Sequence, residues 1–454
     1  MKEFHSLPAS KLIDPSGFKC DCGKKHIAKG LRSINIGSGV ISTLAEVLGK
    51  LGITKPFMVT DKNEYEAAGK KAEALLKEAG IPYRLHIIPS ADGERVAPAE
   101  FATGSIALNF DVSCDGILCV GSGVMNDLCK VMSNITGRPS VVVATAPSMD
   151  GYASDGAAME VNNVKLSLKQ VIPAALICDT DIMSKAPMNM LWAGLGDRLG
   201  KYTALSEWKI VRLLHNESYC AETAKLVGVS LDKIVSAAPG IPKRDERSIA
   251  AITEGLVLSG IAMAFAETSR PASSLEHYFS HCWEMMAIAR GEECDLHGIQ
   301  VGVGTILTLK IYEHLKEIHP TMERVYAHAD SFDTAAWEAN IRRVFSDTAD
   351  NIIAMEQRLH KNERNGRIAR AERIIANWDE ILKIAEEMPK ASEIEAIMKN
   401  VGMPTSPSDI GISNRDVIDA FICSRDVREK YLVSGLIWDI GYMEEFATWL
   451  EENI

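Results

Sequence analysis

Residues 116–130 read Gly-Ile-Leu-Cys-Val-Gly-Ser-Gly-Val-Met-Asn-Asp-Leu-Cys-Lys, which is an apolar run, a glycine-rich turn and the start of a helical pattern. The run Gly116–Val120 is typical of a buried strand. The turn Gly121-Ser122-Gly123 brings backbone N–H groups and a helix N-terminus to one point, which suits a pyrophosphate. Asp127 favours the first turn of the helix, and Lys130 carries a charge that could neutralise phosphate. This stretch therefore predicts a strand–turn–helix unit that binds a phosphate-bearing ligand.

Similar strands surround this unit in the first part of the chain. Helical stretches such as Ile41–Leu51 and Glu64–Glu78 separate several of them. Strand–helix alternation predicts a parallel sheet covered by helices. The other expected strands are Ser33–Ile36, Pro56–Thr60, Tyr83–Ile88, Ser140–Ala144 and Ala174–Cys178.

A predicted hairpin follows, and after it the sequence pattern changes from strands to helices. Ala157–Val161 and Val164–Leu168 flank Asn162-Asn163, residues that tolerate the positive φ of a tight turn. After Lys185-Ala-Pro187 strand signals nearly vanish and helical periodicity continues almost to the end, with a loop at Met403–Ser413 before two closing helices. We therefore expect an α/β domain over residues 1–186, an all-α domain over residues 187–454, and an active site in the cleft between them.

Composition excludes several classes of protein. The chain has 454 residues, 46% of them hydrophobic and 24% charged, and its net charge is −12. An acidic chain without Lys/Arg blocks argues against nucleic acid as a partner. Gly255–Ala266 is the most apolar region and is shorter than the roughly 18 residues of a membrane span, so no span is expected. The N-terminus lacks a signal-peptide pattern, and ten scattered cysteines are typical of reduced thiols, so we expect a cytoplasmic protein.

Two segments of the α/β part could contact a cofactor. Gly37-Ser-Gly39 precedes a helix, and Asp61 ends the next strand 22 residues after Gly39, which is a partial dinucleotide fingerprint. The third glycine is missing, so an ordinary strand–helix turn remains an alternative. Thr145–Ser154 lies at the carboxyl end of the Ser140–Ala144 strand, where open α/β sheets bind ligands, and a plain loop is its alternative.

The helical part contains a candidate metal site. Asp197, His277, His281 and His297 provide one carboxylate and three imidazoles, and His277 and His281 lie one helical turn apart. Zn²⁺, Fe²⁺ or Ni²⁺ accepts such oxygen and nitrogen donors. Histidines at this spacing also occur on helix faces that bind nothing, so the spacing alone leaves both interpretations open.

Cys20, Cys22 and His26 form half of a zinc-binding pattern near the N-terminus. A fourth ligand is missing from the neighbouring sequence, and Cys-x-Cys differs from the usual zinc-knuckle spacing. The sequence therefore favours a turn without a metal at this place.

The order of these motifs resembles the superfamily of iron alcohol dehydrogenases, glycerol dehydrogenases and dehydroquinate synthases. Within it, Ser269–His281, which reads Ser-Arg-Pro-Ala-Ser-Ser-Leu-Glu-His-Tyr-Phe-Ser-His, is similar to the glycerol-1-phosphate dehydrogenase family, and His297-Gly298 agrees. The Cys-x-Cys-Gly start and Pro404–Gly411 are similar to its longer bacterial-type branch. The resemblance extends from Cys20 to past residue 430.

The resemblance implies roles for individual residues. Its fold is a Rossmann-like domain followed by a helical domain. One divalent metal ion (Zn, Ni or Fe) would be bound by Asp197, His277 and His297, with His281 beside them as a catalytic residue. Asp150 would be catalytic and bind substrate, and Lys201 or Arg270 would bind the substrate phosphate. The cofactor would contact Asp61, Gly121, Ser122, Gly123, Asp127, Thr145, Ser148 and Ser154; the family commonly has glycine where Ser122 stands.

The implied activity is reduction of dihydroxyacetone phosphate to sn-glycerol 1-phosphate by NAD(H) or NADP(H), in either direction. The implied partner is a phosphorylated triose or polyol, in a homo-oligomer such as a homodimer. Because an acidic Asp61 disfavours a ribose 2′-phosphate, we expect NADH to be used at least as well as NADPH. A glycerol or polyol dehydrogenase and a dehydroquinate-synthase-like cyclase are the alternatives, and the cyclase usually has Glu where this chain has Asp197.

Overall fold

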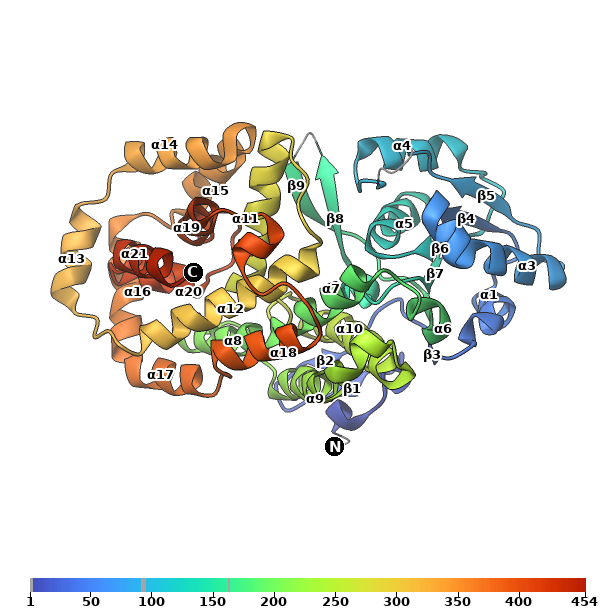
Figure 1. Cartoon of the computed structure of the whole chain (residues 1–454), viewed down its shortest axis with the longest axis horizontal. Coiled ribbons are helices and arrows are strands. Elements are labelled where there is room, and N and C mark those ends of the chain that lie inside the picture. The colour runs from blue at the N-terminus through green and yellow to red at the C-terminus, as the bar shows by residue number, and fades with distance from the viewer. Residues whose placement is uncertain (1–2, 91–94, 162–163) are drawn as a thin grey trace. The chain divides into compact units, whose positions relative to one another are not determined.

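The computed structural model describes residues 3–90, 95–161 and 164–454, in two compact units (Figure 1). The first unit comprises residues 1–198 and 220–269, and the second comprises residues 199–219 and 270–454. Each unit is therefore built from two separate segments of the chain, and the helices Ala221–Ala237 and Glu246–Ala266 belong to the first unit. Whether residues 1–186 bind the dinucleotide and residues 187–454 the metal and substrate stays a prediction.

A six-stranded sheet forms the centre of the first unit, and every neighbouring pair of strands is parallel. The strand order is β3-β10-β7-β6-β4-β5. All six strands were expected from the sequence within one residue at each end. Their bounds are β3 Ser33–Gly37, β4 Pro56–Thr60, β5 Arg84–Ile87, β6 Gly116–Gly121, β7 Ser140–Ala144 and β10 Ala175–Asp179.

The central strands are buried on both faces, as parallel strands covered by helices require. Alternate residues such as Leu118 and Val120 in β6 and Val141 and Val143 in β7 pack with the apolar sides of two helices, α1 (Leu44–Leu51) and α3 (Lys70–Glu78). The expected helix over Glu64–Glu78 is interrupted by a π-turn at Tyr65–Gly69. The remaining helices of this unit are α2 Lys62–Glu64, α4 Glu100–Asn109, α5 Gly123–Thr136, α6 Thr180–Met183, α7 Met188–Leu199, α9 Ala221–Ala237 and α10 Glu246–Ala266.

Two antiparallel hairpins accompany the sheet. Strands β8 (Gly156–Val161) and β9 (Val164–Lys169) pair as the sequence predicts, and the expected turn residues Asn162-Asn163 lie outside the described residues. Strands β1 (Phe18–Lys19) and β2 (Lys25–His26) form a second, shorter hairpin near the N-terminus. The sequence does not predict this second hairpin, because two-residue strands carry no periodic signal.

Helix α10 corrects the expectation about membrane-spanning length. It has 21 residues and contains an 18-residue window with a mean hydropathy of 1.8, so it is long and apolar enough to cross a membrane by those two measures alone. In the structure 72% of its apolar window is buried inside the protein. The core helix of a globular unit has the same two properties, because such a helix is apolar on all sides.

Within its described residues, the second unit is helical throughout. The bounds are α8 Lys201–His215, α11 Leu275–Arg290, α12 His297–Leu315, α13 Met322–Asp330, α14 Thr334–Phe345, α15 Ala349–Leu359, α16 Arg364–Ala376, α17 Trp378–Glu386, α18 Ala391–Asn400, α19 Asn414–Cys423, α20 Val433–Asp439 and α21 Met443–Asn453. The expected loop Met403–Ser413 contains one short 3-10 turn, Pro407–Ile410. The expected fold class, an α/β part followed by a mostly helical part, is confirmed.

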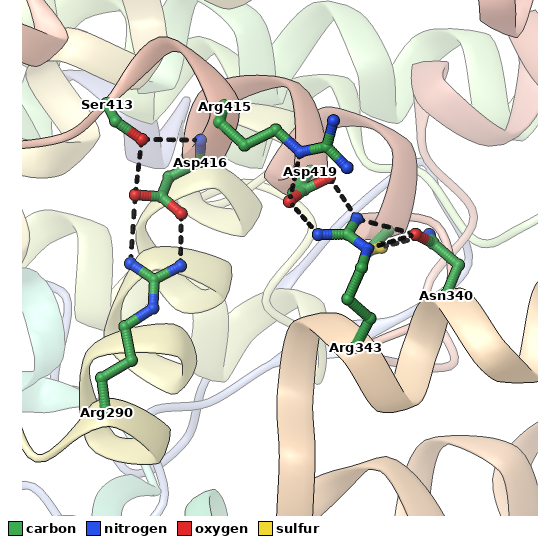
Figure 2. Close-up of polar contacts among 8 residues, drawn as sticks. Arg290, Asn340, Arg343, Ser413, Arg415, Asp416 and Asp419 are labelled. Atoms are coloured by element: carbon green, nitrogen blue, oxygen red, sulfur yellow. Dashed lines mark hydrogen bonds and ion pairs between the residues drawn. The ribbon is translucent and has the colours of Figure 1, made fainter.

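Two carboxylates on α19 connect three helices of the second unit (Figure 2). Asp416 accepts two hydrogen bonds from the guanidinium of Arg290, at the end of α11. Asp419 accepts two from Arg343 of α14, at 2.8 and 2.6 Å. Both pairs are bidentate, the geometry in which a guanidinium and a carboxylate bind most strongly. The first pair fixes α19 against α11, the helix that carries His277 and His281, and the second pair fixes α19 against α14.

Candidate active site

The glycine turn after β6 is closed by a carboxylate that the sequence did not predict, that of Glu64. Backbone N–H and Oγ–H of Ser122 both donate to Oε1 of Glu64, at 3.1 and 2.8 Å. Burial raises the pKa of Glu64 above its ordinary value, although these hydrogen bonds oppose the rise. This carboxylate occupies the N–H of Ser122, one of the donors of the turn at Gly121–Gly123 that the sequence assigns to a phosphate. Glu64 gives no signal in the sequence, since it lies 58 residues before its partner.

The first glycine turn, Gly37-Ser-Gly39, is engaged by the protein itself. The backbone N–H groups of Gly39 and Ile41 donate to the two carboxylate oxygens of Asp179, at 3.1 and 3.2 Å. Asp179 ends β10, the strand beside β3. An internal carboxylate thus satisfies donors that would otherwise face a phosphate, which gives this turn a structural role.

Asp61 begins the short helix α2 at the carboxyl end of β4. Its Oδ1 accepts a hydrogen bond from the backbone N–H of Glu64 at 2.7 Å, so it is an N-cap residue. Its side chain is half-buried. One carboxylate oxygen of Asp61 therefore caps α2. The residue lies at the end of β4, where the family resemblance implies that the adenosine ribose binds.

Asp127 and Lys130 hold the chain that follows β7. The buried ammonium of Lys130 donates to the carbonyls of Gly151 and Gly156, at 2.6 and 2.7 Å. Asp127 accepts from the backbone N–H of Ala158 at 3.0 Å. The suggestion that Lys130 neutralises a cofactor phosphate does not agree with these contacts, because its ammonium is fully buried against the protein's own carbonyls. It braces the carboxyl-terminal end of the loop that contains the other candidates.

That loop runs from Thr145 to Ser154. Thr145 is buried at the end of β7, and its N–H donates to the carbonyl of Gly121, which links the loop to the glycine turn. Ser154 is buried and donates from Oγ to the carbonyl of Gly151 at 3.0 Å. Ser148 is half-buried between them. Three of the residues expected to contact a cofactor thus lie on one braced segment.

Asp150 and Asp197 are brought together, as their proposed roles require. The backbone N–H of Asp150 donates to Oδ2 of Asp197 at 2.9 Å, and the carboxylate of Asp150 accepts from Ser259 of α10 at 2.9 Å. Asp197 is 1% exposed. Gly194, one turn earlier on α7, lets the helix approach this closely, because a Cβ there would lie 1.9 Å from the carbonyl oxygen of Pro147.

In the second unit a carboxylate orients His277. Nδ1 of His277 lies 2.8 Å from Oε1 of Glu276, which also accepts from the backbone N–H of Ser274 at 2.7 Å. The other oxygen of Glu276 accepts from Thr203 at 2.6 Å. Burial raises the pKa of Glu276, but these hydrogen bonds outweigh burial and the pKa lies below its ordinary value. An ionised Glu276 keeps the proton on Nδ1 and leaves Nε2 of His277 with a lone pair.

A neutral chain of hydrogen bonds orients His297, the first residue of α12. Nδ1 of His297 lies 2.8 Å from Oγ of Ser280, whose own proton is donated to Oε1 of Gln300 at 3.0 Å. The amide of Gln300 is fixed in turn, because it donates to the carbonyl of Asp295 at 2.9 Å. Ser280 therefore accepts from Nδ1, and Nε2 of His297 again carries a lone pair. The rings of His277 and His297 lie 5.4 Å apart, centroid to centroid.

His281 lies beside His297 rather than apart from it. The two rings stack with centroids 5.4 Å apart, and Glu284 lies within 3.6 Å of His281 and 3.4 Å of His297. Burial lowers the pKa of His281 to about 3, so this imidazole is neutral near pH 7. His281, Glu284 and His297 have ligand atoms within 4.8 Å of one another, which makes a donor set different from the expected one and shares only His297 with it.

The two candidates for phosphate recognition differ in how they are held. Lys201, the first residue of α8, is fully buried. Arg270 forms a bidentate pair with Glu217, at 2.8 and 2.7 Å, and donates from Nη1 to the carbonyl of Tyr431 at 2.7 Å. Each guanidinium nitrogen of Arg270 thus has a partner in the protein, which fixes the position of the segment before α11.

The donor set fits a divalent metal ion chemically. Asp197 is a buried carboxylate of the first unit, and His277 and His297 are imidazoles of the second unit whose Nε2 atoms carry lone pairs. Oxygen and neutral nitrogen ligands are what Zn²⁺, Fe²⁺ and Ni²⁺ accept. Hydrogen bonds that fix the tautomer of each histidine are typical of metal-binding imidazoles.

Comparison with known proteins agrees with this description. Residues 35–187 match the family model of iron-containing alcohol dehydrogenases. A protein of Halalkalibacterium halodurans named glycerol-1-phosphate dehydrogenase [NAD(P)+] is 30% identical over 426 residues, which is 94% of this chain and 96% of that protein.

The chain belongs to the glycerol-1-phosphate dehydrogenase family. As a member of it, the protein is an oxidoreductase. A relative of the same name from Geobacillus thermodenitrificans is 28% identical and covers 90% of this chain. Among solved structures, a probable glycerol dehydrogenase from Sinorhizobium meliloti shares the fold, with a TM-score of 0.59, 16% identity and coverage of 93% of this chain and 98% of that one.

Proposed function

We propose that this member of the glycerol-1-phosphate dehydrogenase family reduces dihydroxyacetone phosphate to sn-glycerol 1-phosphate with NADH or NADPH, and catalyses the reverse reaction. The observation that carries the proposal is the pair of oriented imidazoles, His277 and His297. It is supported by the similarity of nearly the whole chain to relatives named glycerol-1-phosphate dehydrogenase [NAD(P)+]. We propose Asp197, His277 and His297 as ligands of one divalent metal ion.

The residues of the chain position the reactants. When bound, a divalent metal supplies positive charge beside the ketone oxygen, and nicotinamide supplies the hydride. Glu276 and Ser280 hold the two imidazoles in the tautomer that can bind a cation. His281, which is neutral and half-buried, is proposed to lie beside the substrate without adding charge.

Asp150 is proposed to bind substrate hydroxyls. Its backbone N–H fixes one oxygen of Asp197, and Ser259 fixes its carboxylate, so both acids are held in one orientation. Pre-set orientation of such groups lowers the entropy cost of reaching a reactive geometry. Lys201 or Arg270 is proposed for the substrate phosphate, and Arg270 can bind it only by releasing Glu217 or the carbonyl of Tyr431, which now accept from its guanidinium nitrogens.

The cofactor is proposed to bind the turn at Gly121–Gly123 and the loop Thr145–Ser154, with Asp61 at the adenosine ribose. The carboxylate of Asp61 repels a ribose 2′-phosphate, so we expect kcat/KM with NADH to equal or exceed that with NADPH. A large preference for NADPH would contradict this assignment. The protein is also proposed to be a homo-oligomer, which size-exclusion chromatography with light scattering tests.

The handedness of the product tests the activity. The purified protein is supplied with dihydroxyacetone phosphate and NADH, and the glycerol phosphate formed is analysed with an enantiomer-specific enzyme. We expect the 1-phosphate enantiomer. Formation of the 3-phosphate enantiomer would overturn the proposal, and faster oxidation of glycerol than of glycerol 1-phosphate would assign the protein to the polyol dehydrogenases instead.

A further inference from the structure

A second cluster of metal-binding side chains lies in the first unit, on the N-terminal hairpin. Cys20, Cys22 and His26 come from the hairpin β1–β2 and its loop, which turns back through a hydrogen bond from the N–H of Gly23 to the carbonyl of Cys20. Gly23 has a φ of +83°, which glycine adopts without strain. The structure places Cys220, the N-cap residue of α9, beside these three.

The distances among the four side chains match those of a tetrahedral zinc site. Sγ of Cys20 and Cys220 are 3.6 Å apart, and Nε2 of His26 lies 3.3 Å from Sγ of Cys22 and 3.3 Å from Sγ of Cys220. All four ligand atoms lie within 4.8 Å of one another. Tetrahedral zinc with Zn–S of about 2.3 Å and Zn–N of about 2.0–2.1 Å separates two sulfurs by about 3.8 Å and sulfur from nitrogen by about 3.6 Å.

The histidine of this cluster is prepared to bind a cation. Nδ1 of His26 lies 2.8 Å from the backbone carbonyl of Phe265 in α10, so Nδ1 carries the proton and donates it. Nε2, which faces the sulfurs, then has a lone pair. The ring is 1% exposed and stacks on Phe265 with centroids 5.5 Å apart. A backbone carbonyl that fixes the tautomer is the usual outer partner of a metal-binding histidine.

We propose that Cys20, Cys22, His26 and Cys220 bind a structural zinc ion, separate from the catalytic metal. Three thiols would release their protons to solvent on binding, and zinc with three thiolates and one neutral imidazole carries one negative charge. Four protein ligands leave no position for substrate, which is the mark of a structural site. Binding would connect the N-terminal hairpin to α9, which lies 200 residues further along the chain.

A disulfide between Cys20 and Cys220 is the competing explanation. The Sγ–Sγ distance of 3.6 Å is much longer than the roughly 2.05 Å of a disulfide. A disulfide would also leave Cys22 and His26 without a role, although both point into the same cluster. Zinc accounts for all four side chains together.

X-ray absorption at the zinc edge tests the proposal on the purified wild-type holoenzyme. We expect sulfur neighbours at about 2.3 Å in the zinc spectrum, because the proposed catalytic ligands contain no sulfur. A zinc spectrum with only nitrogen and oxygen neighbours would overturn the proposal. So would a disulfide-linked pair of peptides containing Cys20 and Cys220 in protein purified under argon.

Metal content of variants gives the second test. Cys22→Ser and Cys220→Ser should each retain one zinc ion fewer per chain than the wild type. Asp21→Asn, an exposed neighbour in the same loop, should retain the full number. Asp197→Ala should lose metal from the catalytic site yet keep the sulfur signal, so failure of the proposed activity and failure of this site are distinguishable. If a cysteine variant does not fold, the absorption spectrum of the wild type still decides.

Discussion

Replacing Glu276 tests whether a buried carboxylate prepares His277 for metal binding. Glu276→Gln keeps the shape of the side chain and one acceptor oxygen, but removes the negative charge opposite Nδ1 of His277, 2.8 Å away. Loss of such an outer partner typically weakens metal binding 10- to 100-fold, which is about 1.4–2.7 kcal/mol. We expect an effect of that size on the metal affinity of Glu276→Gln.

Alanine would be less informative at this position. Glu276 is the acceptor for buried donors of His277, Ser274 and Thr203. At about 1–3 kcal/mol for each unsatisfied buried donor, Glu276→Ala would cost a large part of a typical folding free energy of about 5–15 kcal/mol. Its loss of metal could then reflect unfolding alone.

The assay is a competition titration of Ni²⁺ against a chromophoric chelator, on protein whose cysteine site is already loaded with zinc. Glu207→Gln is the matched control, because Glu207 is also fully buried in the second unit and lies on α8. Burial raises the pKa of Glu207 to about 8, so its carboxyl is largely protonated near pH 7 and glutamine is a close replacement. Unchanged nickel affinity in Glu276→Gln, or equal weakening in Glu207→Gln, would refute the reasoning.

Three further outcomes are expected. Gly194→Ala should lower the melting temperature, because overpacking against the carbonyl of Pro147 costs about 1–3 kcal/mol of folding free energy. Gly228→Ala, whose added Cβ meets open space, should be neutral or stabilising. Equal effects of the two substitutions would contradict the close approach of α7 to Pro147. The hydrogen bond from Arg290 lowers the pKa of Asp416 in the folded protein, so its contribution to stability is present above the unfolded pKa of about 3.9 and is lost as pH falls through the folded pKa. The melting temperature should therefore fall less between pH 7 and pH 3 in Asp416→Asn than in the wild type, and an equal fall in both proteins would contradict this. Asp61→Asn keeps an N-cap oxygen but removes the charge, so the ratio of kcat/KM for NADPH to that for NADH should rise, and an unchanged ratio would exclude Asp61 from the ribose site.

The strands of the sheet were predictable because each is a short apolar run between turn residues. Their order was not, since strand order depends on how crossover helices pack and leaves no trace in a single strand. The interruption of Glu64–Glu78 by a π-turn was also missed. Gly69 lets the ring of Tyr65 lie against the backbone at this place, because a Cβ there would lie 2.5 Å from that ring.

The candidate site was predictable where a motif is local in sequence. The resemblance named His277 and His297, and the structure brings their rings together within the second unit. Their hydrogen-bond partners were harder, because a glutamate or serine on a helix has many possible roles until its neighbours are known. Glu276 was quoted within a motif without being given a function, and Ser280 and Gln300 were not considered.

Residues that act over long sequence distances were not predictable. Cys220 completes the cluster of Cys20, Cys22 and His26 only because the N-terminal hairpin packs beside the start of α9. A lone cysteine between two helical stretches carries no signal of that role. Glu64 likewise meets Ser122 only through the pairing of β4 with β6.

Helix α10 contacts a residue of each proposed metal-dependent site, Asp150 of the candidate active site and His26 of the cysteine cluster. Ser259 holds the carboxylate of Asp150, and the carbonyl of Phe265 holds the imidazole of His26. Six residues separate them, which is about 9 Å along the axis. If the proposed zinc binds at the thiolates, a chelator that removes it would free a contact at one end of α10, whose other contact holds Asp150, the proposed catalytic acid. Inactivation by such a reagent could then follow the loss of either proposed metal. Measuring the loss of each metal and the loss of activity over time would separate the two causes.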